Sequence, residues 1–207
     1  MGIPDTPTTL GRILCDFTGG PVGHRFRSGG GRRQALPRAI GMKGNVNPCV
    51  VDATAGLGRD AFLLASLGAS VILIERSEEV YHQLAAGMAR ARTVGQEFAR
   101  IMDRMRLLFG DARELLPSLT PEIILVDPMH PPRTKSAQVK NEMRIIREIV
   151  GTDDDSVALM EIALATARKR VVLKWPRRAD PMAGIIAPSH QIIGKSVRYD
   201  VFLRSRQ

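Results

Sequence analysis

A short glycine-containing segment carries the residue types that bind nucleotide-like ligands. The nine residues from Asp52 to Asp60 read DATAGLGRD and lie between a valine-rich apolar run and a helical pattern. Small residues such as Gly56 and Gly58 let the backbone approach a ligand closely, and the N-terminus of the following helix offers unpaired amide groups. The segment predicts a ligand-binding turn between a strand and a helix.

Glu75 supplies an acidic partner for this turn. It ends the next apolar run, 17 residues after Gly58, and a carboxylate at the end of a second strand can accept hydrogen bonds from both hydroxyls of a ribose. Nicotinamide dinucleotides and S-adenosylmethionine both use this arrangement. The alternative is a tight strand-to-helix turn with Glu75 on the surface.

The details of the turn favour S-adenosylmethionine over a dinucleotide. A dinucleotide fingerprint needs three glycines around its pyrophosphate, but Thr54 and Ala61 occupy the first and third of those positions. Asp52 and Asp60 would repel a pyrophosphate, whereas they tolerate a ligand that carries a sulfonium and an α-amino group.

Asp111 and Ala112 are predicted to line the same pocket. They follow the third apolar run, where the carboxylate can accept a hydrogen bond from an adenine amino group while Ala112 contacts the ring. Alternatively, Asp111 caps a short helix at residues 113–116.

The fourth apolar run ends in LVDPMHPP, which predicts a methyl-transfer site. The Asp127 side chain and the Pro128 carbonyl can accept the two hydrogens of an exocyclic amine and turn its delocalised lone pair towards a methyl donor. The reaction then depends mainly on positioning. His130 is predicted to stack on the target base. The alternative is a strand that ends at a proline.

Short β-rich runs alternate with helical patterns from Cys49 onward. The order β-α-β-α-β-β-α-β predicts an α/β fold, with a mainly parallel sheet covered by helices on both faces. Alternation over residues 197–203, after a turn at residues 194–195, predicts a C-terminal antiparallel hairpin at the sheet edge. The other strands are predicted at residues 50–53, 71–74, 106–109, 123–126 and 170–174, and the helices at 60–67, after Ser77, at 136–149 and at 156–167.

The first 47 residues differ from the rest in composition. They hold ten of the 19 glycines, including a triple glycine at residues 29–31, and such a stretch is a poor helix and a poor strand. We therefore expect a basic, glycine-rich N-terminal arm or cap at residues 1–47 and a catalytic domain at residues 48–207, with a flexible leader as the alternative. Four apolar side chains are expected to pack on that domain: Phe17, Val22, Phe26 and Ile40.

Length and composition exclude several classes of protein. The 207 residues suit one domain, and the longest uncharged apolar stretch, residues 61–74, is too short to span a bilayer. The N-terminus lacks the basic flank and apolar run of a secretory signal. Cys15 and Cys49 lie 34 positions apart, which fits unpaired thiols rather than a zinc cluster. We expect a cytoplasmic protein without a membrane segment or a metal site.

The net charge of +9 is unevenly distributed. Residues 1–47, 130–147 and 168–207 carry +5, +4 and +8, and the segments between them are acidic. This segregation suits a polyanionic partner, because each neutralised phosphate releases counterions. The alternative is a generally basic, soluble surface.

These motifs together resemble those of the RsmJ family of small-subunit ribosomal RNA guanine-N2 methyltransferases. The resemblance extends from about residue 15 to the C-terminus. It implies a Rossmann-like class I methyltransferase fold and donor contacts at Arg59, Asp60, Glu75, Arg76, Asp111, Ala112 and Asp127. The segments that carry it are residues 16–20 with 24–25, 29–32, 51–62, 75–76, 127–129, 135–140, 142–144 and 171–174.

The resulting hypothesis is an S-adenosylmethionine-dependent enzyme that methylates N2 of a guanine in small-subunit (16S) ribosomal RNA. The alternatives are an amino methyltransferase acting on adenine or DNA, and a non-catalytic RNA-binding or assembly protein on the same fold. The expected partner is small-subunit ribosomal RNA or the small subunit itself. The basic residues predicted to contact RNA are Arg32, Arg33, Lys135, Lys140, Arg144 and Lys174.

Overall fold

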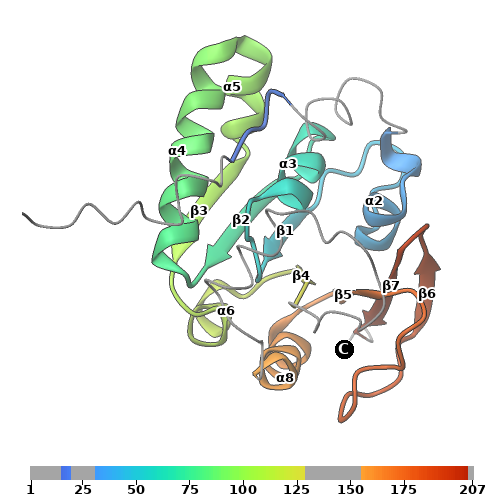
Figure 1. Ribbon diagram of the computed structural model, residues 1–207. Coiled ribbons are helices and arrows are strands. Elements are labelled where there is room, and N and C mark those ends of the chain that lie inside the picture. The colour runs from blue at the N-terminus through green and yellow to red at the C-terminus, as the bar shows by residue number, and fades with distance from the viewer. Residues whose placement is uncertain (1–14, 20–30, 129–154, 205–207) are drawn as a thin grey trace, which may run out of the picture.

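The computed structural model describes residues 15–19, 31–128 and 155–204, which form a seven-stranded sheet with helices on both faces (Figure 1). The strand order is β3-β2-β1-β4-β5-β7-β6. β7 (Val197–Leu203) pairs antiparallel with both β5 and β6 (His190–Ile193), which confirms the predicted hairpin. The other strands run parallel to one another: β1 (Cys49–Asp52), β2 (Ser70–Glu75), β3 (Met105–Phe109), β4 (Ile123–Val126) and β5 (Arg170–Pro176).

The central strands are apolar because both of their faces are covered. All four residues of β4 are buried, and Val50 of β1 pairs with Val71 on one side and Ile123 on the other. Parallel strands buried in this way have near-continuous runs of Val, Ile and Leu. The same register places the carboxyl ends of β1, β2 and β4 side by side at one edge of the sheet.

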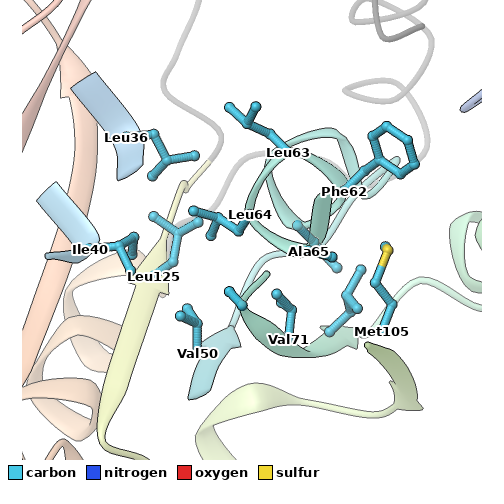
Figure 2. Close-up of a cluster of buried hydrophobic side chains, with 14 of the residues drawn as sticks. Leu36, Ile40, Val50, Phe62, Leu63, Leu64, Ala65, Val71, Met105 and Leu125 are labelled. Carbon is cyan, nitrogen blue, oxygen red and sulfur yellow. The ribbon is translucent and has the colours of Figure 1, made fainter. Parts of the chain in front are cut away.

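Two hydrophobic clusters cover the two faces of the sheet. Four helices contribute to the first cluster, and Figure 2 shows Leu64, Val71 and Leu125 packed together in it. These helices are α2 (Ala35–Ile40), which follows a short 3-10 turn (Gly31–Arg33), α3 (Arg59–Ser66), α4 (Glu78–Val94) and α5 (Gln96–Met102). On the other face lie α6 (Ala112–Leu119) and α8 (Ser156–Thr166).

The predicted order of elements needs correction between β3 and β4, where it passed directly from strand to strand. The structure has α6 there, with Asp111 as its N-cap and Pro117 inside it. α2 and α5 were also not predicted, because helices of six and seven residues show little apolar periodicity. The helix predicted at residues 136–149 lies outside the described residues.

Part of the glycine-rich N-terminal region belongs to the hydrophobic core. Phe17 stacks on Phe62 with ring centroids 5.1 Å apart, and Ile40 is 1% exposed, as predicted for both. Gly87 of α4 is required here, since a Cβ atom would lie 2.6 Å from the carbonyl oxygen of Cys15. Val22 and Phe26 lie outside the described residues. No helix in the described ranges is long and apolar enough to cross a membrane.

Candidate active site

A cavity of about 310 Å³ opens at the carboxyl edge of the parallel strands. This is the edge at which open α/β sheets bind their ligands. Nine of the predicted donor contacts line the cavity: Asp52, Gly56, Arg59, Asp60, Glu75, Arg76, Asp111, Ala112 and Asp127. Their roles in binding remain predictions.

The turn after β1 is shaped by two glycines in the left-handed region. Gly56 has φ 52° and Gly58, the N-cap of α3, has φ 68°. At Gly58 a Cβ atom would also lie 2.8 Å from Leu84 Cδ1 and 3.3 Å from Phe17 Cζ. Gly58 therefore closes the turn onto the core, while Gly56 lines the cavity.

Glu75 is held at the cavity by backbone amides. The N–H of Gly56 donates to Oε2 and the N–H of Ser77 donates to Oε1, both at 2.8 Å. Burial raises the pKa of Glu75 above its usual value, although hydrogen bonds from these amides oppose that shift. A carboxylate has about four acceptor positions, so Glu75 retains capacity to accept from a ribose.

Two arginines and two aspartates form an ion-pair network beside Glu75. Arg76 and Arg113 both contact Asp155 Oδ2, at 2.8 and 3.0 Å. Arg113 also contacts Asp111 Oδ2 at 2.6 Å, and its hydrogen bonds hold the pKa of Asp111 below the usual range. Asp111 caps α6 through the Arg113 amide and still lines the cavity, so both interpretations of this residue describe its position.

The other end of the cavity holds three carboxylates and one ammonium group. Lys174 Nζ lies 2.7 Å from both Asp60 Oδ2 and Asp127 Oδ2. Asp52 is 2% exposed, and burial, reinforced by the charges of Asp60 and Asp127, raises its pKa to about 8. Burial lowers the pKa of Lys174, but the two paired carboxylates outweigh that effect and raise it above its usual value.

Thr54 connects the turn to the end of β4. The backbone N–H of Asp127 donates to Thr54 Oγ1 at 2.7 Å. The sequence showed Thr54 only as a departure from a glycine fingerprint, whereas its hydroxyl fixes the backbone that carries Asp127. Pro128, the next residue, is buried and does not line the cavity.

These residues fit S-adenosylmethionine by their chemistry. The Glu75 carboxylate suits a ribose, and Asp111 and Ala112 lie beside it. The carboxylates of Asp60 and Asp127 suit a ligand end that carries positive charge. The negatively charged pyrophosphate of a dinucleotide would be repelled by the carboxylates at this end.

The structure engages two of the predicted RNA-contact residues, Arg32 and Lys174, in contacts within the protein. Arg32 donates to the carbonyls of Gly44, Val46 and Leu67 and to Asn47 Oδ1, which precede β1 and β2, so it clamps the edge opposite the cavity. Lys174 is mostly buried in the cavity wall and paired with two carboxylates. Arg33 is exposed. The remaining candidates, His130, Lys135, Lys140 and Arg144, lie outside the described residues.

The cavity residues that the sequence did not indicate as parts of a site include Arg113, Asp155 and Leu159. Arg113 follows Asp111 by two positions. An acidic N-cap with a cation at the second helical residue could have predicted that the two side chains pair beside the cavity. Asp155 and Leu159 reach the cavity from α8, and no local pattern links them to residues around position 76.

The sheet order and the cavity define a class I S-adenosylmethionine-dependent methyltransferase. The fold is shared with an RNA methyltransferase from Salinibacter ruber solved with S-adenosyl-L-homocysteine, at a TM-score of 0.52 and 16% identity over 81% of this chain and 88% of that one. The chain belongs to the putative SAM-dependent methyltransferase family, whose model matches residues 4–204. Its methyl donor is S-adenosylmethionine, as predicted.

The chain is also similar to individual members of this family. It is 62% identical over 194 residues to ribosomal RNA small subunit methyltransferase J of Brucella anthropi, covering 94% of this chain and 95% of the relative. It is 64% identical over 191 residues to the protein of that name from Agrobacterium fabrum, covering 92% of each. A solved SAM-dependent methyltransferase from Neisseria gonorrhoeae matches with TM-score 0.73 and 38% identity, over 92% of this chain and 74% of that one.

Proposed function

We propose that this enzyme methylates the exocyclic N2 of a guanine in small-subunit ribosomal RNA. The position of Asp127 carries the proposal, because this carboxylate lies at the end of β4, lines the donor cavity and is fixed by Thr54 and Lys174. The relatives named ribosomal RNA small subunit methyltransferase J support the choice of RNA.

Asp127 and Pro128 prepare the acceptor amine. When bound, S-adenosylmethionine supplies a methyl group on a sulfonium, which passes to the amine nitrogen as the carbon–sulfur bond breaks. The Asp127 carboxylate, which lines the cavity, accepts a hydrogen bond from the amine and turns the lone pair towards that methyl group, and the Pro128 carbonyl remains the predicted acceptor for the second amine hydrogen. Because a paired guanine hides N2 from a concave pocket, the target base is unpaired or flipped, and His130, outside the described residues, is the sequence-based candidate to stack on it.

The exposed arginines after β5 extend the RNA surface beyond Arg33, Lys135, Lys140 and Arg144. Arg177 and Arg178 lie on a turn at the carboxyl edge, and the Arg177 amide donates to Ser196, next to the exposed Lys195. Buried Arg198 fastens the turn by donating to the carbonyls of residues 176, 177 and 179. A turn fixed in this way holds positive charge beside the cavity edge before RNA binds.

The chemical assignment is tested by methyl transfer followed by nucleoside analysis. Small-subunit RNA, free and in assembled subunits, is taken from a strain lacking the protein and incubated with donor labelled on the methyl group. We expect N2-methylguanosine at one position. Label in adenine or in DNA would favour an amino methyltransferase with that substrate. RNA binding without label would favour a non-catalytic assembly protein.

The RNA surface is tested by salt dependence of binding. If about six phosphates are contacted, the log–log slope for single-stranded RNA is on the order of −4, and replacing Arg177, Arg178 and Lys195 with Ala makes it shallower by about 2. The matched control replaces three exposed basic residues near the opposite edge, Lys43, Arg100 and Arg104. Equal slopes for the two triple variants would exclude this turn from the RNA surface.

A further inference from the structure

The acidic end of the cavity depends on one side chain that bridges two strands and a helix. Val126 pairs with Leu173 in the β4–β5 register, so Asp127 and Lys174 lie level on neighbouring strands. Asp60 comes from the first turn of α3. A single ammonium group, 2.7 Å from each carboxylate, therefore joins three elements at the point where the acceptor must bind.

Other charged groups around this cluster have partners of their own. Asp52 accepts from the Thr54 amide, and Glu75 is held by backbone amides. The charged groups that face the cavity from the surrounding elements are Asp52 of β1, Arg59 and Asp60 of α3, Glu75 and Arg76 after β2, Asp111 and Arg113 at α6, Asp127 after β4, and Asp155 at α8. Arg76 and Arg113 pair with Asp155 at the far end.

We propose that Lys174 is a positioning residue for methyl transfer: it fixes one oxygen of Asp127 and keeps that carboxylate in its hydrogen-accepting form. The proposal rests on the function proposed above for Asp127. Holding Oδ2 orients the carboxylate plane, which sets the direction of the amine lone pair. The ammonium also offsets the mutual repulsion of Asp60 and Asp127.

Loss of the ammonium has a distinct physical consequence. Three carboxylates that share a poorly solvated site bind protons more readily, because like charges disfavour ionisation. The protons then belong to the coupled cluster rather than to one residue. A protonated Asp127 donates through its hydroxyl and loses acceptor capacity, and raising the pH removes that proton again.

The test compares Lys174→Met with Lys174→Arg in single-turnover methyl transfer from pH 6 to 9, with saturating donor and RNA. We expect Lys174→Met to lose at least about tenfold in rate at pH 7 and to recover part of it by pH 9, with unchanged RNA half-saturation. Lys174→Arg, which keeps the charge, retains the wild-type pH profile. A second variant, Lys174→Met/Asp60→Asn, removes one carboxylate together with the ammonium. We expect the pH dependence of its methyl-transfer rate to return towards that of the wild type.

A second readout needs neither RNA nor donor. In protein labelled with ¹³C at the aspartate carboxyls, Lys174→Met gives an additional carboxyl titration above pH 6 that is absent from Lys174→Arg. An equal loss of rate at every pH, or identical carboxyl titrations in the two variants, would overturn the proposal. Wild-type protein that fails to methylate guanine would overturn the proposed function instead, because the carboxyl titration does not depend on the acceptor.

Discussion

The two ends of the donor cavity hold their carboxylates by different means. At one end Glu75 accepts hydrogen bonds from the backbone amides of Gly56 and Ser77. At the other end Asp60 and Asp127 share the side-chain ammonium of Lys174. Backbone amides do not titrate and are lost only on substitution by proline, whereas an ammonium bridge depends on one side chain. We therefore expect a single side-chain substitution to change the charge at the Asp127 end more readily than the backbone hydrogen bonds at the Glu75 end.

The largest expected effect separates chemistry from donor binding. Asp127→Ala should reduce single-turnover methyl transfer by roughly 10²- to 10⁴-fold, the scale of a positioned acid–base group, while donor affinity changes far less. Asp180→Ala, at an exposed carboxylate, is the control. A wild-type rate in Asp127→Ala would remove this residue from the mechanism.

The next effect concerns the ribose end. Glu75→Ala should weaken S-adenosylmethionine binding by roughly 1 to 3 kcal/mol, about 5- to 150-fold, because charge-assisted hydrogen bonds are lost. Calorimetry at pH 6 and pH 9 should give a similar loss, and wild-type protein should not bind NAD. Unchanged affinity would place Glu75 outside the donor site. The comparison between the Glu75 and Asp127 ends of the cavity would then not apply to donor binding.

Asp52 should make stability depend on pH. Its pKa of about 8 in the folded state exceeds the value near 3.9 of an unfolded aspartate. Between those values the folded state binds the additional proton, so the free energy of unfolding falls as pH rises from about 4 to 8. Asp52→Asn should flatten this part of the Tm profile, whereas Asp180→Asn should not. Parallel curves of Tm against pH for wild type and Asp52→Asn would contradict a raised pKa of Asp52 in the folded state.

The smallest effect is expected at the rim of the ribose end. The Arg113 side chain is 36% exposed, and ion pairs of that kind contribute about 0.2 to 1 kcal/mol. Arg113→Ala should therefore weaken donor binding by no more than about fivefold in calorimetry. A loss beyond tenfold would mean that Arg113 contacts the donor directly.

The strand-to-helix turn and the carboxylates at strand ends were predictable because they follow from local spacing. Asp52, Glu75 and Asp127 each follow an apolar run directly, and parallel strands bring such positions to one edge. The ion pairs of Lys174 were not predictable, for the opposite reason. Its pairing with Asp60 joins residues 114 positions apart, and no local pattern distinguishes a buried lysine from an exposed one.

Arg32 shows the same limit in another form. Its positive charge and its neighbouring glycines suit RNA binding, yet four acceptors from two segments, residues 44–47 and Leu67, engage its guanidinium. Net charge describes what a surface can attract but not which cations are already paired.

The Thr54 hydroxyl restricts how this chain can diverge or be redesigned. Serine retains the acceptor for the Asp127 amide, but glycine, alanine and valine leave that buried amide without its partner. Grafting a dinucleotide fingerprint onto residues 54–61 would therefore loosen the acceptor site while attempting to change the donor. Donor specificity and acceptor geometry must evolve together in this protein, because one side chain belongs to both.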